Sequence, residues 1–219
     1  MKKYILFDLD GTLLDSMQYH AKAWLEVFSK YGLDFKEEDI YLNEGALEFE
    51  VVKKMFEEKS INITKEQFEE LFKIQKRIFR EKYSKKVKPF PEVPDLLQEL
   101  KKQGKELALV TSSHQEIFEE VFPVSLRKFF SLILTGDRTS RRKPHPEPYL
   151  KALEALSAGR ENALVVENAP AGILSAKSAS LFCIGITTTL PEEKLSLADL
   201  VVRNHLELRD VLLNGKGKI

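Results

Sequence analysis

The sequence predicts an α/β fold, a Rossmann-like parallel sheet flanked by helices, with an all-helical cap inserted near the start of the chain. Two patterns carry this prediction. Short apolar runs of the kind that form buried parallel strands recur along the chain, and helical patterns lie between most of them. Residues 16–85 break this alternation, because they are helical throughout. The apolar runs lie at 4–7, 107–110, 132–134, 163–166, 181–186 and 200–202.

Helices are expected between these strands. In the segment 94–103, Leu96, Leu97 and Leu100 recur at helical spacing, and Gly104 follows where a glycine C-cap is common. Strands that alternate with helices form a parallel sheet covered on both faces. In such a sheet the ligand site lies beyond the carboxyl ends of the strands. Further helices are expected at 115–122, 147–156 and 169–179.

The helical block is interpreted as a cap that follows the first strand and its loop. Ala21, Trp24 and Phe28 fall on one helical face, and Thr64 with Gln67 has the spacing of a capping box. Three prolines, Pro89, Pro91 and Pro94, mark the return to the sheet. The predicted domains are a core of residues 1–15 and 86–219 and a cap of residues 16–85.

The composition argues against several classes of protein. Among 219 residues, 34 Lys and Arg balance 34 Asp and Glu, so neither nucleic acid nor a membrane is expected as a partner. Asp8 and Asp10 break the apolar start too early for a signal peptide, and no apolar run approaches the roughly 18 residues of a membrane span. The single cysteine, Cys183, cannot form an internal disulfide and is expected to be buried. We therefore expect a cytoplasmic protein, and the composition does not indicate its oligomeric state.

The strongest signal for chemistry is the segment Phe7–Ser16, which places Asp8 and Asp10 directly after the first predicted strand. Two carboxylates this close raise each other's pKa unless a cation holds them, and Mg²⁺ prefers carboxylate oxygens. Gly11 allows the backbone to turn sharply and to approach an anion. A carboxylate nucleophile divides phosphoryl transfer into two easier steps, and a second acid can protonate the leaving group and then activate water.

The run Asp8-Leu9-Asp10-Gly11-Thr12 resembles the first motif of the haloacid-dehalogenase superfamily, in its branch of phosphatases and phosphomutases. Dehalogenases lack the second acid, so Asp10 favours phosphoryl chemistry. The resemblance spans nearly the whole chain, because three later motifs follow in the family's order. It implies that Asp8 is the nucleophile, that Asp10 is the general acid and base, and that Leu9 and Gly11 bind the phosphate.

The second and third motifs supply a hydroxyl and a cation. Thr111 and Ser112 follow a predicted strand, where a hydroxyl and a backbone N–H can hold a phosphate oxygen. Lys143 lies in a loop stiffened by three prolines, and its ammonium can neutralise the nucleophile and the phosphoryl oxygens. The family's lysine is followed directly by proline, which distinguishes Lys143 from Arg141 and Arg142. The resemblance implies that Thr111 and Lys143 are catalytic and that Ser112 binds phosphate.

The fourth motif contains Glu167 and Asn168, after another predicted strand. The family usually carries two acids here, and the second is commonly a direct Mg²⁺ ligand. Asn168 offers a carbonyl oxygen but no charge. The resemblance therefore implies a working but weaker Mg²⁺ site formed by Asp8, the backbone carbonyl of Asp10, Asn168 and, directly or through water, Glu167. A catalytically inactive protein is the rival interpretation.

The resemblance also implies that the substrate is a small phosphorylated metabolite. The segment His20–Trp24 is similar to the His-x-x-Ala-Trp segment of beta-phosphoglucomutases and related sugar-phosphate phosphatases. His20 can hydrogen-bond Asp10 or gate its protonation, since histidine titrates near neutrality. An ordinary half-buried helix histidine is an equally good interpretation, and Trp24 is expected to be a cap core residue.

A phosphatase acting on a sugar phosphate or a phosphoglycolate-like ester is the favoured function. Residues 43–48 are acidic where the mutases carry an arginine for a second phosphate, and His114 stands where they carry a lysine. Beta-phosphoglucomutase is therefore the alternative within the family. A catalytically weak binding or regulatory protein on the same fold is the alternative outside enzymes, because a fold does not determine a function.

Overall fold

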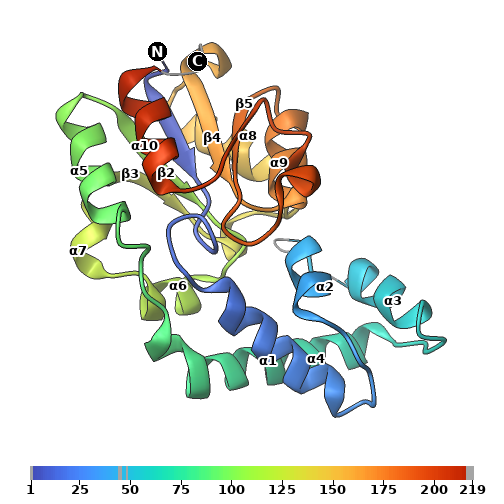
Figure 1. The fold of residues 1–219 in the computed structure, drawn as a ribbon. Helices are drawn as coiled ribbons and strands as arrows, with labels where there is room; N and C mark the ends of the chain where they lie inside the picture. Colours follow the sequence, from blue (N-terminus) through green and yellow to red (C-terminus); the bar gives the residue numbers. More distant parts are fainter. Residues whose placement is uncertain (1, 44–45, 48, 216–219) are drawn as a thin grey trace.

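The computed structural model describes residues 2–43, 46–47 and 49–215, and its centre is a six-stranded parallel sheet (Figure 1). The strand order is β3-β2-β1-β4-β5-β6, so the first strand of the chain lies in the middle of the sheet. Each predicted apolar run forms a strand, and the ends shift by two residues or fewer. The strands are β1 (Tyr4–Phe7), β2 (Glu106–Val110), β3 (Phe130–Leu134), β4 (Ala163–Glu167), β5 (Phe182–Ile186) and β6 (Leu200–Val202).

Alternate residues of the central strands belong to two buried clusters on opposite faces of the sheet. Ile5 and Phe7 of β1 share a cluster with the apolar side chains of α5 (Val93–Lys102) and α10 (His205–Asn214). Leu6 shares the other cluster with α8 (Glu147–Ala155) and α9 (Pro170–Ser178). Because helices cover both faces, the central strands are apolar at consecutive positions rather than at every second one, apart from Glu106 and Glu167 at their ends. The predicted α/β class is confirmed.

The predicted core helices are present, and two more accompany them. Gly104 ends α5 with φ +74°, and the N–H of Lys105 donates to the carbonyl of Leu100 (3.0 Å), as in a Schellman motif. A short helix, α7 (Val124–Arg127), follows α6 (Gln115–Val121). The apolar pattern did not predict α10, which Asn204 caps by accepting the N–H of Glu207 (3.0 Å). Cys183 is buried, as expected.

Four helices form a separate group below the carboxyl ends of the strands (Figure 1). Their packing is dominated by aromatic rings, with Phe28 lying 5.2 Å from Trp24, 5.0 Å from Phe35 and 5.6 Å from Phe56 between ring centroids. No strand occurs in the described part of residues 16–85. The helices are α1 (Met17–Ser29), α2 (Glu37–Leu42), α3 (Phe49–Glu57) and α4 (Lys65–Ile78), and a π-helical turn, Phe79–Tyr83, and a 3₁₀ turn, Ser84–Lys86, continue α4.

The two connections between the sheet and these helices run side by side. The N–H of Asp15 donates to the carbonyl of Lys88 (2.9 Å), and the N–H of Phe90 donates to the carbonyl of Leu13 (3.1 Å). The backbone thus passes between the sheet and the helical group at one place. The exact domain boundaries, after residues 15 and 85, stay a prediction.

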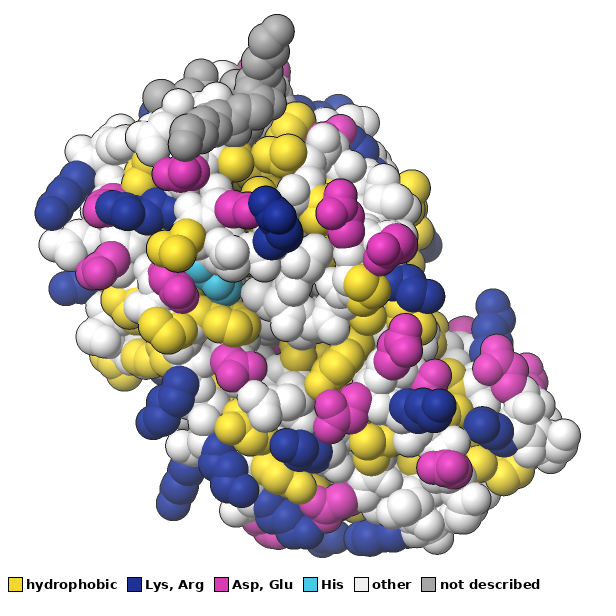
Figure 2. Space-filling model, in the orientation of Figure 1, with side chains coloured by type: hydrophobic (Ala, Val, Ile, Leu, Met, Phe, Trp, Pro, Cys, Tyr) yellow, Lys and Arg dark blue, Asp and Glu magenta, His cyan; other side chains and the backbone are white. Residues whose placement is uncertain are grey.

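The surface carries mixed charge. On the face shown in Figure 2, Lys and Arg side chains are interspersed with Asp and Glu over both parts of the molecule. None of the helices in the described ranges combines the length and the apolar character that a bilayer crossing requires.

The predicted capping box at the start of α4 is present, and its loss should be measurable. Thr64 Oγ1 accepts the N–H of Gln67 (3.2 Å), and Gln67 Oε1 accepts the N–H of Thr64 (2.8 Å). Thr64→Ala should lower the free energy of unfolding by about 1 kcal/mol, because one N–H at the helix start loses its acceptor. Urea denaturation measures the change. Thr64→Ser, which keeps the hydroxyl, should retain most of the stability, and equal stability of the alanine variant would contradict the prediction.

Candidate active site

The ammonium of Lys143 joins three of the predicted site segments. Its Nζ donates to Asp8 Oδ1 (2.6 Å), to Glu167 Oε1 (2.7 Å) and to the carbonyl of Val110 (3.0 Å). Asp8 directly follows β1, Glu167 ends β4 and Val110 ends β2. These three strands are neighbours in the sheet, so their carboxyl ends bring the side chains together. Lys143, Asp8 and Glu167 are all buried.

Burial sets the ionisation of this cluster. It raises the pKa of Asp8 well above its usual value, Glu167 and Asp10 raise it further, and Lys143 only partly opposes them. Burial alone would lower the pKa of Lys143, but the carboxylates of Asp8 and Glu167 outweigh it and hold the pKa above its usual value. Lys143 is therefore charged at neutral pH.

The second carboxylate oxygen of Asp8, Oδ2, is accessible to a substrate. Among the described residues nothing donates a hydrogen bond to Oδ2, whereas every fully buried side-chain nitrogen and oxygen there has a partner. Oδ2 therefore faces accessible space, the position that an attacking oxygen needs.

The carboxylate of Asp10 accepts three side-chain hydrogen bonds. Ser16 Oγ (2.6 Å) and His20 Nε2 (3.2 Å) contact Oδ1, and Ser113 Oγ contacts Oδ2 (2.7 Å). The hydrogen bond expected between His20 and Asp10 is therefore present. Burial would raise the pKa of Asp10, but His20 and the hydrogen bonds from Ser16 and Ser113 bring it below its usual value. The His20 ring also stacks on Phe79, 4.1 Å between centroids, which fixes its orientation.

The second motif lies at the end of β2, next to Asp10. Thr111 is buried, and its Oγ1 accepts the N–H of Ser113 (3.0 Å). This bond holds the turn that carries the Ser113 hydroxyl to Asp10. Ser112 lies between the two and lines a cavity described below.

The first motif forms a tight turn around Leu9 and Gly11. The carbonyl of Leu9 accepts the N–H groups of Leu13 (2.9 Å) and Leu14 (3.0 Å). Gly11 has φ +81°, and its own N–H donates to the carbonyl of Leu14 (2.8 Å). A Cβ at Gly11 would lie 2.1 Å from Asn168 Nδ2. Glycine is thus required because the first and fourth motifs touch here, and its N–H is already engaged in the turn.

The side chain of Asn168 is held at both ends. Its Oδ1 accepts the hydroxyl of Thr12 (3.3 Å), and its Nδ2 donates to Thr189 Oγ1 (3.1 Å). Within the ranges that the structure covers, no group of three or more His, Cys, Asp or Glu side chains is arranged to hold a metal ion. The predicted ligand set differs from such a group, since it includes the amide of Asn168 and a backbone carbonyl.

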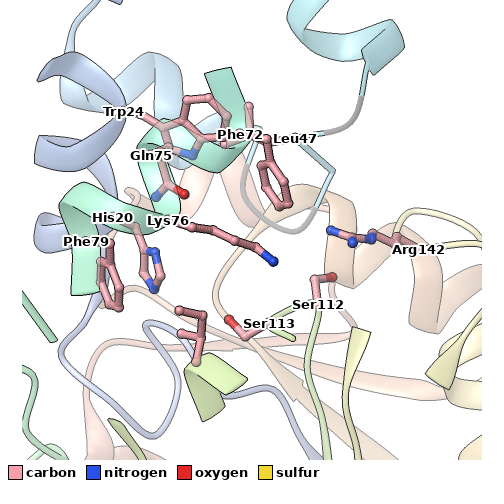
Figure 3. A pocket seen from close by; sticks show the side chains of 11 residues that line it. His20, Trp24, Leu47, Phe72, Gln75, Lys76, Phe79, Ser112, Ser113 and Arg142 are labelled. Carbon is pink, nitrogen blue, oxygen red and sulfur yellow. The ribbon is translucent and has the colours of Figure 1, made fainter. Parts of the chain in front are cut away.

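A cavity of about 80 Å³ lies between the cap helices α1 and α4 and the loops of the sheet (Figure 3). It adjoins Asp10, because His20 and Ser113 both line it and both contact that carboxylate. Trp24 is buried, as expected of a core residue, and also forms part of the wall. Of the acidic segment 43–48, Leu47 lines the cavity, and Glu44, Gly45 and Glu48 lie outside the described residues. The other lining residues are Phe72, Gln75, Lys76, Phe79, Ser112, Ile117 and Arg142.

The family model of haloacid dehalogenase-like hydrolases matches residues 5–186, a range that contains all four motifs. The chain belongs to this family. Haloacid dehalogenase-like hydrolases with solved structures share its fold. It is similar to a candidate beta-phosphoglucomutase from Bacteroides vulgatus, with 27% identity, a TM-score of 0.85, and coverage of 100% of this chain and 91% of that one. It is also similar to CbbY from Rhodobacter sphaeroides in complex with phosphate, with 26% identity, a TM-score of 0.75, and 95% and 96% coverage.

Several relatives of this hydrolase are named as phosphatases. A phosphoglycolate phosphatase from Aquifex aeolicus is 33% identical over 81% of both chains. A phosphorylated carbohydrates phosphatase from Thermotoga maritima is 32% identical over 88% of this chain and 89% of that one. A validoxylamine A 7'-phosphate phosphatase from Streptomyces hygroscopicus subsp. limoneus is 30% identical over 95% and 97%. The hydrolase is therefore an enzyme of the phosphatase type.

Three side chains of the site were not assigned from the sequence. Ser16 and Ser113 bind Asp10, and Tyr149 donates its hydroxyl to Glu167 Oε1 (2.5 Å). Ser16 directly precedes α1, where serine is common as a helix cap. The sequence alone therefore gave no reason to assign it to the binding of Asp10. Tyr149 lies on the buried face of α8 and follows the pattern of an apolar core residue.

The Tyr149 hydroxyl should contribute to the stability of the hydrolase. Tyr149→Phe removes one of the two side-chain donors to Glu167 Oε1 and should lower the free energy of unfolding by about 1–3 kcal/mol, since a buried charged acceptor loses a partner. Urea denaturation measures the difference. Tyr31→Phe, at an exposed position, is the control. Equal stability of the two variants would show that the hydroxyl does not matter.

Proposed function

We propose that this hydrolase is a cytoplasmic, Mg²⁺-dependent phosphatase that hydrolyses a small phosphate monoester through an aspartyl-phosphate on Asp8. The observation that carries the proposal is the buried ion pair of Asp8 with Lys143, which leaves Asp8 Oδ2 accessible beside Asp10. Relatives named as phosphatases of phosphoglycolate and of phosphorylated carbohydrates support the substrate class.

In the first step, Asp8 Oδ2 forms a bond to phosphorus and the bond from phosphorus to the ester oxygen breaks. Asp10 gives a proton to that oxygen, and the alcohol leaves. Lys143 stabilises the charge on the phosphoryl oxygens, and the Thr111 hydroxyl and the backbone N–H groups of Leu9 and Ser112 hold them. Gly11 contributes the turn rather than a donor.

In the second step, the carboxylate of Asp10 takes a proton from water, whose oxygen attacks phosphorus. The bond to Asp8 breaks and inorganic phosphate is released. The three hydrogen bonds that lower the pKa of Asp10 favour its ionised form, which this step requires. With that proton Asp10 is ready to protonate the next leaving group, and His20, 3.2 Å from Asp10 Oδ1, holds the carboxyl group in position for both steps.

The donor set fits Mg²⁺. Asp8, Asp10 and Glu167 are buried carboxylates, and Lys143 is the buried lysine that they share, so negative charge is in surplus if all three acids ionise. Burial above all, and then the carboxylates of Glu167 and Asp10, raise the pKa of Asp8, and a bound cation would favour its ionised form. Asp8, the Asp10 carbonyl and Asn168 would hold the ion, with Glu167 direct or through water. When bound, it would supply further charge stabilisation for the phosphoryl oxygens.

A beta-phosphoglucomutase is the second candidate, and the similarity to the candidate mutase from Bacteroides vulgatus favours it. The two activities differ in their products. A mutase converts beta-glucose phosphate between its isomers in the presence of the bisphosphate and releases no phosphate, whereas the proposed phosphatase releases phosphate at each turnover.

Removing the charge of the nucleophile should abolish hydrolysis. Asp8→Asn should lower kcat/KM for p-nitrophenyl phosphate by at least about 1,000-fold, since an amide cannot form the covalent intermediate. Phosphate release in the presence of Mg²⁺ measures the rate. Asp15→Asn, at an exposed position of the same segment, should retain activity. Wild-type turnover by Asp8→Asn would overturn the proposal.

Restoring an acid at the fourth motif should strengthen the metal site. Asn168→Asp adds a negative charge at a predicted ligand, so the Mg²⁺ concentration for half-maximal activity should fall. Calorimetric titration of Mg²⁺ without substrate should show tighter binding in the same variant. A requirement that is unchanged or higher, with unchanged calorimetric affinity, would reject the role of residue 168 as a ligand.

A further inference from the structure

The side chain of Asn168 can bind a cation in only one of its two orientations. An amide presents a carbonyl oxygen on one side and, on the other, an NH₂ group that only donates hydrogen bonds. Mg²⁺ binds oxygen ligands and is repelled by the NH₂ hydrogens. A carboxylate at the same position would present an oxygen in either orientation. An asparagine that serves as a ligand therefore requires neighbours that distinguish its oxygen from its nitrogen.

Thr189 is placed to make this distinction. It follows β5, which pairs with β4 up to Glu167 and Gly185, so the residues after both strands meet at the carboxyl edge of the sheet. Asn168 is buried and Thr189 is half-buried. The Nδ2 atom of Asn168 donates to Thr189 Oγ1 (3.1 Å), although the two residues are 21 positions apart in the sequence.

The one proton of the Thr189 hydroxyl is used in another bond. Thr189 Oγ1 donates it to the backbone carbonyl of Asn168 (3.4 Å). With this proton engaged, Oγ1 offers only lone pairs to the side chain, so it can accept from the NH₂ group but cannot donate to the amide oxygen. The opposite orientation of the amide would set two oxygens against each other, or the hydroxyl would have to leave the backbone carbonyl. Thr189 therefore specifies which end of the amide faces it.

The oxygen end of the amide has a partner of matching polarity in the first motif. Asn168 Oδ1 accepts the hydroxyl of Thr12 (3.3 Å). A carbonyl oxygen has two lone pairs, so Oδ1 can keep this bond and also bind a cation. The first motif also carries Asp8 and the carbonyl of Asp10, the other predicted ligands. Oδ1 thus contacts the motif with which it would share the ion.

We propose that Thr189 is a positioning residue of the metal site, because its hydroxyl holds the Asn168 amide with the carbonyl oxygen available to Mg²⁺. The inference rests on the proposed function, which makes Asn168 a metal ligand. Thr189 is not itself a predicted ligand and acts through Asn168. Its hydroxyl allows a neutral amide to serve at a position where the family usually carries an acid.

The experiment is a double-mutant cycle on the affinity for Mg²⁺. Calorimetric titration without substrate measures Mg²⁺ binding by the wild type, Thr189→Val, Asn168→Asp and the variant with both substitutions. Valine neither donates nor accepts a hydrogen bond, and Thr189→Ser keeps the hydroxyl. Thr187→Val is the matched control. Thr187 lies in the same loop and is also half-buried, but its hydroxyl donates to the carbonyl of Arg203 (3.2 Å).

Thr189→Val should raise the dissociation constant of Mg²⁺ about tenfold, as expected when a metal ligand loses the partner that orients it. Thr189→Ser and Thr187→Val should stay within about twofold of the wild type, since both keep a hydroxyl at the Asn168 amide. In the Asn168→Asp background, Thr189→Val should change the constant by about twofold or less, because a carboxylate presents an oxygen in either orientation. The cost of removing the hydroxyl should thus depend on asparagine at position 168.

Two results would overturn the inference. Equal losses of affinity in both backgrounds would assign Thr189 only to the shape of its loop, and an affinity that Thr189→Val leaves unchanged would remove its role altogether. Hydrolysis of p-nitrophenyl phosphate by the same proteins separates these results from a failure of the proposed function. If the wild type binds Mg²⁺ and hydrolyses the ester, the proposed function stands whatever Thr189→Val does. Without Mg²⁺ binding by the wild type this inference falls, and without hydrolysis the proposed function falls.

Discussion

The buried ammonium of Lys143 is the constraint on which the site depends. Removing a lone lysine from water costs on the order of several kcal/mol, so it stays charged inside the protein only if acceptors meet it from several directions. Asp8, Glu167 and the carbonyl of Val110 do so at 3.0 Å or less. These acceptors come from the ends of three adjacent strands, β2, β1 and β4. The same contacts that stabilise the lysine therefore fix the positions of the loops that would act on phosphate.

Two glycines allow close packing of the backbone against polar side chains of the fourth motif. Glu167 receives Lys143 and Tyr149 on one oxygen, and a Cβ at Gly172 would lie 2.0 Å from that carboxylate. Gly11 meets Asn168 in the same way. Two glycines thus allow a helix start and a turn to close on polar side chains, which keeps water from separating the ion pairs.

The sequence predicted what local patterns can encode. The apolar runs gave the strands, and the family motifs placed Asp8, Lys143 and Glu167, which the structure brings into contact. It missed contacts that depend on tertiary distance alone. Ser113 reaches Asp10 across 103 positions, and His114 meets Lys76 and Arg142 across 38 and 28. Tyr149 has the burial pattern of an apolar residue, so its hydroxyl carried no signal. The helix α10 was not predicted because charged residues interrupt its apolar pattern, although Asn204 marks its start.

The core and the cap differ in the interactions that hold their functional residues in place. The phosphate end is built from buried ion pairs within the sheet, which leave little freedom. Ion pairs join Lys76 of α4 and Arg80 of the π-helical turn after it to Glu116 and Glu120 of α6, and these side chains are 21–51% exposed. Pairs of this kind contribute little in water. One buried apolar cluster, however, contains residues of both parts, among them Phe79 of the cap and Ile117 of the core. The position of the cap over Asp8 and Asp10 therefore depends on apolar packing beside the cavity, and exclusion of water from the site depends on the same packing.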